Sequence, residues 1–427
     1  MNILLTGASG FIGSHLLREL YAQGHNIKAC VRDPDLAEKR FSGPEYIAGD
    51  FSKDIRPEKW QPRLEGVDIV INAVGIIHES AAQRFDTLHR DAPIALFQAA
   101  ADSGVRRIIQ VSALGADSSA QSHYHLSKRS ADDYLAELPL DWVILRPSIV
   151  YGPGAKSMSL FRALAALPLT PVIGDGRQPI QPIHIDDLVH ATVHCIQDPE
   201  VIRRKIDLVG PKPITMLELL QLQRQWLGQG PLRPLPVPYP ISLHLAGVSG
   251  FLGNTPINRA SVQMLQRGNT GDVNAFSEYF HFKPQDIRDL LSHTPATVAD
   301  RWYAGLYFLR PLLRISIALV WIVTGLSSAC FYPTQESYVL LDRTGINGML
   351  APLMLYGAAA LDLLLGFALL FSFRLPIAAL IQIVMMCGYS LIISVALPEF
   401  WLHPFGPVTK NLPLIVATLI MVVMEKR

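Results

Sequence analysis

The chain has 427 residues, a formal net charge of +1 and a hydrophobic content of 50%. This length accommodates two or three domains, and a charge so close to zero excludes a nucleic-acid partner held by bulk electrostatics. The mean hydropathy of +0.26 is high for a purely soluble protein. The four cysteines lie far apart without CxxC or Cys–His spacing, so we expect no metal site.

The first predicted element is a short buried strand over 3–6, which runs into the glycine-rich letters TGASGFIG. Such a turn places backbone N–H groups and the positive end of a helix dipole where they bind a pyrophosphate. A strand before the turn, a helical pattern after it and a second strand at 26–31 complete a βαβ unit. We therefore expect a dinucleotide here, contacted by Gly7, Ser9, Gly10, Phe11, Ile12 and Gly13.

Residues 1–150 alternate short apolar strands with helical patterns, which indicates a parallel sheet covered on both faces. A helix at 91–103 is expected to precede the fifth strand. The region 151–300 is less regular and richer in Pro and Gly, so we interpret it as a small substrate domain with an extended connector at 228–240. The strands are expected at 3–6, 26–31, 46–48, 68–72, 107–112 and 142–146.

The composition changes sharply near residue 301, where long and nearly uncharged apolar runs begin. These runs lie at 315–331, 349–373, 375–397 and 412–424. A bilayer core of ~30 Å needs about 20 helical residues, so the fourth run is ambiguous by length. We expect a transmembrane domain over 301–427 with about four helices. The predicted fold class is α/β, a Rossmann-type doubly wound parallel sheet with a small substrate domain, followed by an all-α transmembrane bundle.

The basic residues near these runs predict the orientation of the bundle. With the N-terminal domain in the cytoplasm, four spans place Arg301, Arg310, Arg314, Arg374, Lys426 and Arg427 inside, against Arg343 and Lys410 outside. This distribution follows the positive-inside rule, and no secretory leader is recognised before the first strand. We expect a multi-pass protein of a bacterial-type inner membrane with a cytoplasmic N-terminal domain.

Tyr124 and Lys128 lie four residues apart near the start of a helix that continues to about residue 135. This spacing puts both side chains on one helical face. A phenol has an ordinary pKa of about 10, and a neighbouring ammonium favours its ionised form. We therefore expect Tyr124 to act as an acid/base and Lys128 to lower its pKa and hold the ribose of the cofactor.

These motifs resemble the short-chain dehydrogenase/reductase superfamily, in its extended and atypical branches, over residues 1 to about 295. The resemblance rests on the glycine loop, on the Tyr124–Lys128 pair, and on the letters NAVG at 72–75, RPSIVYGP at 146–153 and PIHIDDL at 182–188. Within the superfamily the chain is similar to the group of the NAD(P)-binding accessory subunit of respiratory complex I. The C-terminal part resembles the four-helix DoxX-like family.

The resemblance implies a tyrosine acid/base, a lysine that lowers its pKa, and a hydroxyl that orients the substrate carbonyl. The extended branch usually offers this hydroxyl about two positions after Ser112, where Leu114 stands. Ser112 is the nearest candidate for the role, with Ser118 and Ser119 as alternatives. A serine bonded to the backbone at a strand end is an equally good interpretation of Ser112. Further cofactor contacts are implied for Asp50, Asn72, Ala73 and Pro147.

The second strand ends at the pair Arg32 and Asp33, which bears on the choice of cofactor. An arginine there accommodates the 2′-phosphate of NADP, whereas an acid holds the ribose 2′-OH of NAD. Arg32 comes first, so we expect NADP, with NAD as the alternative.

The expected function is a membrane-anchored NAD(P)-dependent oxidoreductase or epimerase that transfers a hydride to or from a carbonyl or hydroxyl substrate. Anchoring favours a lipid or quinone-like small molecule and contact with membrane lipid. The alternative is a non-catalytic NADP(H)-binding assembly protein with a partner in a membrane complex. Asp362, inside the second apolar run, indicates either a functional or a helix-pairing site.

Overall fold

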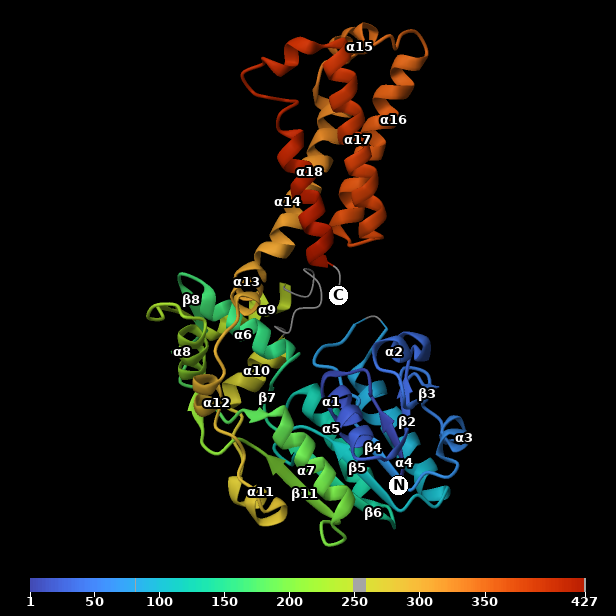
Figure 1. The fold of residues 1–427 in the computed structure, drawn as a ribbon, viewed down its shortest axis with the longest axis vertical. Coiled ribbons are helices and arrows are strands. Elements are labelled where there is room, and N and C mark those ends of the chain that lie inside the picture. Colours follow the sequence, from blue (N-terminus) through green and yellow to red (C-terminus); the bar gives the residue numbers. More distant parts are fainter. Residues whose placement is uncertain (81, 249–258, 426–427) are drawn as a thin grey trace. The chain divides into compact units, whose positions relative to one another are not determined.

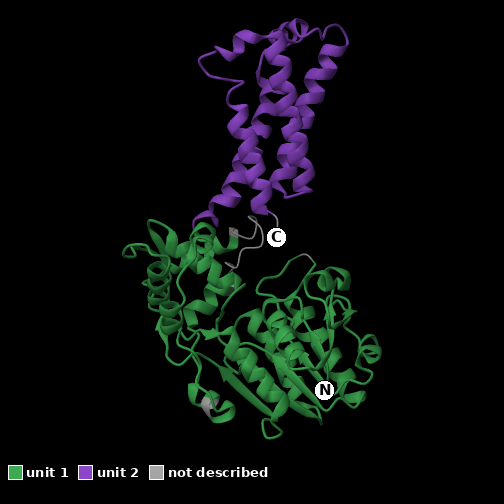
Figure 2. Cartoon of the chain, in the orientation of Figure 1, with its two compact units in different colours: residues 1–304 green, residues 305–427 purple. Residues whose placement is uncertain are grey.

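The computed structural model describes residues 1–80, 82–248 and 259–425. The chain divides into two compact units, Met1–Ala304 and Gly305–Arg427 (Figure 2). The first unit contains a seven-stranded sheet, and the second is a bundle of helices.

The sheet of the first unit has the strand order β11-β6-β5-β4-β1-β2-β3, and all of its pairings are parallel. The order reverses between β1 and β4, which is where doubly wound sheets bind their ligands. The predicted fold class is confirmed. Only β11 was not predicted, because its outward residues are polar and it lies at the sheet edge. The strands are β1 (Asn2–Thr6), β2 (Asn26–Val31), β3 (Glu45–Ala48), β4 (Ile69–Asn72), β5 (Arg107–Val111), β6 (Asp141–Pro147) and β11 (Arg204–Leu208).

Helices cover both faces of this sheet because successive strand residues point to opposite sides. Ile3 and Leu5 of β1 face one core, against α1 (Phe11–Ala22) and α7 (Ile185–Gln197). Leu4 faces the other core, with α3 (Gln61–Leu64), α4 (Ala92–Asp102) and α5 (His123–Glu137), as Figure 1 shows. Continuous apolar strands, buried on both faces, follow from this arrangement.

A third core lies in the remainder of the first unit. It joins α6 (Lys156–Ala166), α8 (Met216–Trp226) and α12 (Ile287–His293). The connector predicted at 228–240 contains β13 (Pro234–Val237), which pairs in parallel with β8 (Thr170–Ile173). Shorter elements complete the unit: α2 (Pro34–Arg40), η1 (Pro57–Lys59), η2 (Asp86–Asp91), β7 (Val150–Tyr151), β9 (Pro179–Ile180), β10 (Ile183–His184), β12 (Ile214–Thr215), α9 (Tyr239–Val248), α10 (Arg259–Arg267), α11 (Val273–Phe280) and α13 (Val298–Leu306).

The second unit consists of α14 (Leu309–Leu326), η4 (Ser327–Phe331), α15 (Thr334–Arg343), α16 (Leu350–Leu370), α17 (Leu375–Ala396), η5 (Pro398–Trp401) and α18 (Asn411–Glu425). Three helices, 309–331, α16 and α17, are long and apolar enough to cross a membrane. The first begins at Leu309 rather than at residue 315, because Leu312 and Leu313 extend its apolar run. The apolar helix α18 has 15 residues, so a fourth span stays a prediction.

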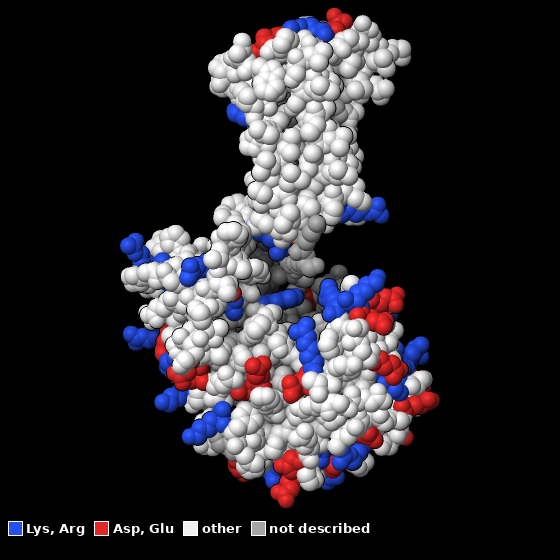
Figure 3. Space-filling view, in the orientation of Figure 1, with Lys and Arg blue, Asp and Glu red and all other residues white. Residues whose placement is uncertain are grey.

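Charged side chains pair at the ends of the bundle. Arg310 and Arg314 of α14 meet Glu425, and Arg343 pairs with Glu399. Between these ends the face of the second unit seen in Figure 3 carries few charges. Lys426 and Arg427, on which the predicted orientation partly depends, lie outside the described residues.

Candidate functional site

The glycine loop between β1 and α1 is shaped by close backbone contacts. Gly7 adopts a φ of +72°, and a Cβ added there would lie 2.8 Å from the carbonyl carbon of Ala73. A Cβ on Gly13 would lie 2.1 Å from the carbonyl oxygen of Gly7. Gly10 caps α1 without a side-chain hydrogen bond, so first-turn N–H groups remain for a ligand. The loop fits a pyrophosphate.

The remaining predicted loop contacts surround these glycines. Ser9 is exposed, and Phe11 and Ile12 are half-buried. The ring of Phe11 lies edge-on to His15, with centroids 5.5 Å apart. These positions are compatible with the cofactor contacts predicted for them, which remain predictions.

The ends of β2 and β3 carry the residues predicted to select the cofactor. Arg32 is exposed, whereas Asp33 caps α2, accepting a hydrogen bond from Leu36 N at 3.0 Å. Asp50 accepts the backbone N–H and hydroxyl of Ser52. Although burial opposes it, these bonds and nearby cations, including Arg32, hold the pKa of Asp50 below its usual value. Asp33 is thus engaged in capping a helix, while the choice between NADP and NAD stays a prediction.

Asn72, at the end of β4, is fully buried. Its side chain accepts from Thr6 Oγ1 and donates to Gln110 Oε1, both at 2.7 Å, and so ties the ends of β1, β4 and β5 together. These bonds fix the amide at the end of β4, and the cofactor contact expected from Asn72 stays a prediction. Ala73 stays beside Gly7, and the buried Pro147 ends β6, where its carbonyl accepts Leu114 N.

Tyr124 and Lys128 lie on one face of α5, as expected. Lys128 is buried, and its Nζ donates to the carbonyls of Val74 and Val111 at 3.1 Å each, so the lysine reaches the loop after β4. Burial lowers the pKa of Lys128 to about 8. Burial and then Asp132 raise the pKa of Tyr124 to about 12, which is opposite to the direction expected from the lysine.

Ser112 makes a contact that the sequence analysis missed. Its hydroxyl donates to Asp132, which is fully buried on the same face of α5, one turn beyond Lys128. The proton of this hydroxyl is therefore engaged with Asp132 rather than available to a substrate carbonyl. The alternatives point elsewhere, because Ser118 is exposed and Ser119 bonds Asp117 and Arg267. The spacing of four from Lys128 to Asp132 was the available signal.

His89 is a second residue that the sequence analysis missed, and no spacing in the sequence marks it. It lies on the π-helical turn η2, is fully buried, and accepts the N–H of Ile76 at Nε2, 3.0 Å away. Its Nδ1 then donates to Ser127 Oγ at 3.2 Å, and its ring lies edge-on to Tyr124, with centroids 5.2 Å apart. Burial, then Lys128, lowers the pKa of His89 well below its ordinary value. A neutral His89 thus positions the tyrosine.

We expect Asp132→Asn to remove a pH dependence of stability. Burial raises the pKa of Asp132 from 3.8 to about 7, so the folded chain holds an extra proton between these values. Stability therefore falls as the pH rises through this window, by about 1.4 kcal/mol per pH unit at most. Thermal unfolding of the full chain between about pH 4 and pH 7 measures it.

The matched control is Asp133→Asn, which changes the next residue, a half-exposed aspartate paired with Arg129 and Lys205. This variant should keep the slope of the wild type. An Asp132→Asn protein with an unchanged slope would show that Asp132 is ionised throughout.

Comparison with known proteins covers both units. Residues 7–160 match the family model described as NAD(P)H-binding, and residues 318–419 match that of the DoxX-like family. The predicted resemblance is therefore confirmed for both parts of the chain.

Two relatives that are named for different functions are similar to this chain. The chain is 30% identical over 199 residues to a ceramide reductase of Caulobacter vibrioides. This match covers 46% of the chain and 61% of the relative. It is 26% identical over 283 residues to NADH dehydrogenase [ubiquinone] 1 alpha subcomplex subunit 9 of Arabidopsis thaliana, which covers 64% of the chain and 68% of that protein. The first match spans less than two thirds of the relative's own length.

Solved structures share the fold of the first unit. A nucleoside-diphosphate-sugar epimerase from Staphylococcus aureus aligns with a TM-score of 0.56 at 19% identity, covering 68% of this chain and 99% of that one. MoeE5 in complex with UDP-glucose and NAD aligns with a TM-score of 0.52 at 21% identity, covering 68% and 96%. At these identities the likeness establishes the fold alone.

Proposed function

Because the chain joins an NAD(P)-binding, epimerase-like domain to a DoxX-like membrane domain, we propose that it is a membrane-anchored NADP-dependent oxidoreductase. The observation that carries the proposal is the placement of Tyr124 and Lys128 on one face of α5, beside the strand ends where the sheet order reverses. Such a site belongs at the switch point of a doubly wound sheet.

The chain's own residues supply the proton chemistry. Tyr124 gives a proton to the substrate oxygen when a carbonyl is reduced, and takes one from the hydroxyl when an alcohol is oxidised. Within the described residues its own hydroxyl has no hydrogen-bond partner, so it is available to a substrate. His89 and Ser127 hold the ring and the backbone of Tyr124 in place.

The dinucleotide is held by backbone and side chains together. The N–H groups at the start of α1 would bind the pyrophosphate, Arg32 the 2′-phosphate, and Lys128 the nicotinamide ribose. When bound, the nicotinamide accepts or donates the hydride. Lys128 is buried, and its Nζ donates to the carbonyls of Val74 and Val111. Its charge therefore lies beside the loop after β4, where a Cβ added to Gly75 would be 3.3 Å from Nζ.

The proposed substrate is a lipid with a ketone or secondary hydroxyl. The apolar helices of the second unit keep the dinucleotide domain at the bilayer, and the ceramide reductase among the relatives acts on a molecule of this kind. We place the bundle in a bacterial-type inner membrane with four spans and the dinucleotide domain in the cytoplasm, in accord with the positive-inside rule.

We expect Arg32→Ala to weaken NADPH binding while leaving NADH binding unchanged. A charge-assisted pair with a phosphate contributes about 1.5–3 kcal/mol, which is roughly a 10- to 100-fold change in Kd. Arg40→Ala is the matched control, because Arg40 is an exposed cation at the end of the same helix, α2. Fluorescence titration of the full chain with both nucleotides measures the ratio. If Arg32→Ala weakens NADH binding as much as NADPH binding, the proposed preference for NADP is wrong.

The second candidate is a non-catalytic NADP(H)-binding subunit of a membrane complex. Two observations favour it. The hydroxyl of Ser112 is engaged with Asp132, and Leu114 stands where the extended branch usually offers the substrate-orienting hydroxyl. The similarity to subunit 9 of NADH dehydrogenase points the same way. Replacement of Tyr124, treated in the Discussion, separates the two candidates.

A further inference from the structure

Three polar side chains lie on the inward stripes of the helical bundle. Trp321 of α14, Asp362 of α16 and Gln382 of α17 are each no more than 5% exposed. The stripes are otherwise made of small and apolar residues: Ile317, Ala318, Leu365, Leu369, Ala378, Ala379 and Met386. We call Trp321, Asp362 and Gln382 the polar layer.

The polar layer occupies one level of the bundle. A Cβ on Gly325 would lie 3.2 Å from Asp362 Cβ, and one on Gly366 would lie 3.0 Å from the carbonyl of Ala318. Trp321 lies between Ala318 and Gly325 on α14, so it faces the turn of α16 from Asp362 to Gly366. Measured along their own helices, Asp362 of α16 and Gln382 of α17 each lie about 12 Å or less from the turn that joins the two helices. Helix geometry therefore puts the two residues at a similar height in the bundle.

The polar atoms of this layer lack partners. Trp321 Nε1, Asp362 Oδ1 and both amide atoms of Gln382 have no hydrogen-bond partner among the residues that the structure describes. The buried hydroxyl of Thr418, by contrast, donates to the carbonyl of Leu414 on its own helix. Unpaired polar groups in an apolar bundle are costly, and in membranes they mark functional sites.

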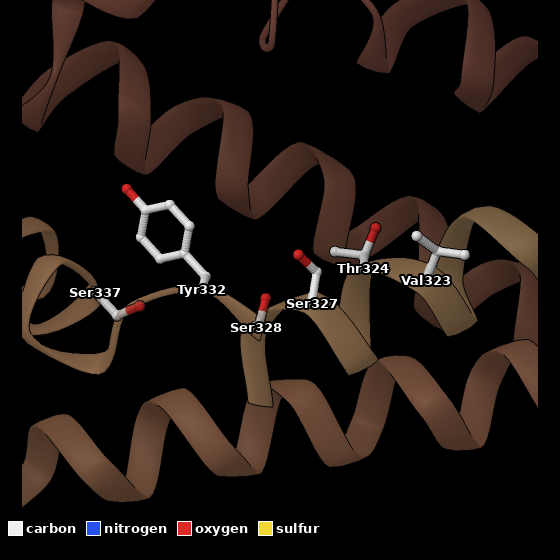
Figure 4. A pocket seen from close by; sticks show the side chains of 6 residues that line it. All are labelled: Val323, Thr324, Ser327, Ser328, Tyr332 and Ser337. Carbon is white, nitrogen blue, oxygen red and sulfur yellow. The ribbon is translucent and has the colours of Figure 1, made fainter. Parts of the chain in front are cut away.

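A hydroxyl-rich pocket of about 320 Å³ borders the same part of α14. Figure 4 shows the hydroxyls of Thr324, Ser327 and Ser328 on one side of this stretch. Thr324 directly precedes Gly325, the residue against which Asp362 packs, and Ser328 lies on the face of Gly325 one turn on. The pocket also includes a π-helical turn, η4, a feature frequent at functional sites. The hydroxyls of the pocket therefore lie on the part of α14 next to Gly325, which packs against Asp362 of the polar layer.

We propose that the polar layer binds the polar end of a neutral lipid that carries both a hydrogen-bond donor and a carbonyl. The ligand carbonyl accepts from Trp321 Nε1–H and the Gln382 amide, and the ligand donor pairs with Asp362 Oδ1 and Gln382 Oε1. An anionic headgroup is disfavoured, because the layer holds a carboxyl group and no cation. The site is separate from the dinucleotide domain and does not depend on the reaction proposed for it.

Binding is tested with the full-length chain in phosphatidylcholine nanodiscs, labelled with fluorotryptophan. The Trp321 resonance is assigned by its loss in Trp321→Phe. N-lauroylethanolamine, which has both donors and a carbonyl, should shift this resonance saturably. N,N-dimethyldodecanamide, which has a carbonyl without a donor, and laurate, which is anionic, should bind at least about tenfold more weakly, a difference of one decade in Kd.

Gln382→Leu should weaken binding of N-lauroylethanolamine at least about tenfold. Its thermal stability should equal or exceed that of the wild type, because no hydrogen bond is lost. Thr418→Val is the matched control, since the Thr418 hydroxyl already bonds the backbone, and it should bind as the wild type does. Three results would each overturn the proposal: a Trp321 resonance that no probe moves, equal binding of laurate, or unimpaired binding by Gln382→Leu.

Discussion

Tyr124→Phe should abolish turnover while leaving NADPH binding intact. The substitution removes the hydroxyl that moves the proton and keeps the ring against His89. General acid–base catalysis contributes about 10²- to 10⁴-fold to a rate, so we expect kcat to fall by roughly three orders of magnitude. The assay follows NADPH formation by the full chain from NADP⁺ and ceramide in vesicles, with NADPH titration of the same protein alongside.

The matched control is Tyr134→Phe, which removes a phenol at the far end of the same helix, where it bonds Gln98. This variant should turn over at the wild-type rate. If Tyr124→Phe retains the wild-type rate or phenotype, the oxidoreductase proposal is wrong and the assembly subunit becomes the better interpretation. Loss of NADPH binding in Tyr124→Phe would instead show that the tyrosine is structural.

Gly13→Ala should disrupt the dinucleotide site. The added Cβ would lie 2.1 Å from the carbonyl oxygen of Gly7, which is part of the backbone and cannot rotate away. The first turn of α1 must therefore move off the loop, and the N–H groups aimed at the pyrophosphate move with it. We expect about 2–3 kcal/mol of lost stability from this overpacking, and NADPH binding weakened by roughly 100-fold.

Gly230→Ala provides the comparison, because a Cβ at Gly230 has nothing within 4 Å. Its NADPH affinity and melting temperature should match those of the wild type. Calorimetric titration and thermal unfolding of both variants measure the two effects. Wild-type affinity in Gly13→Ala would mean that the pyrophosphate does not depend on the approach of α1 to the loop.

Much of the fold is visible in local patterns. The six predicted strands of the sheet are present, because strands buried on both faces read as short apolar runs between helices. The seventh, β11, alternates with polar residues at the sheet edge and leaves no such signal. The helices that could cross a membrane follow from their length and apolarity.

Only part of the candidate site could be predicted from the sequence. Tyr124, Lys128 and the glycines are recognisable because their spacing is local. The partners of Ser112 and Asn72 are set by contacts between distant strands and helices. The same holds for His89, which meets Ile76 and Ser127 only because η2 packs against α5. Burial likewise reverses the expected direction of the Tyr124 pKa.

The sequence by itself therefore determined the fold class, the dinucleotide loop and the tyrosine–lysine pair, because these depend on local patterns and on residues within a few positions of one another. Only the tertiary structure decided the engagement of Ser112 with Asp132 and the neutral state of His89. It also buried Trp321, Asp362 and Gln382 in the bundle without hydrogen-bond partners for their polar atoms among the described residues. Desolvation and long-range packing set these features, and neither is written in local spacing.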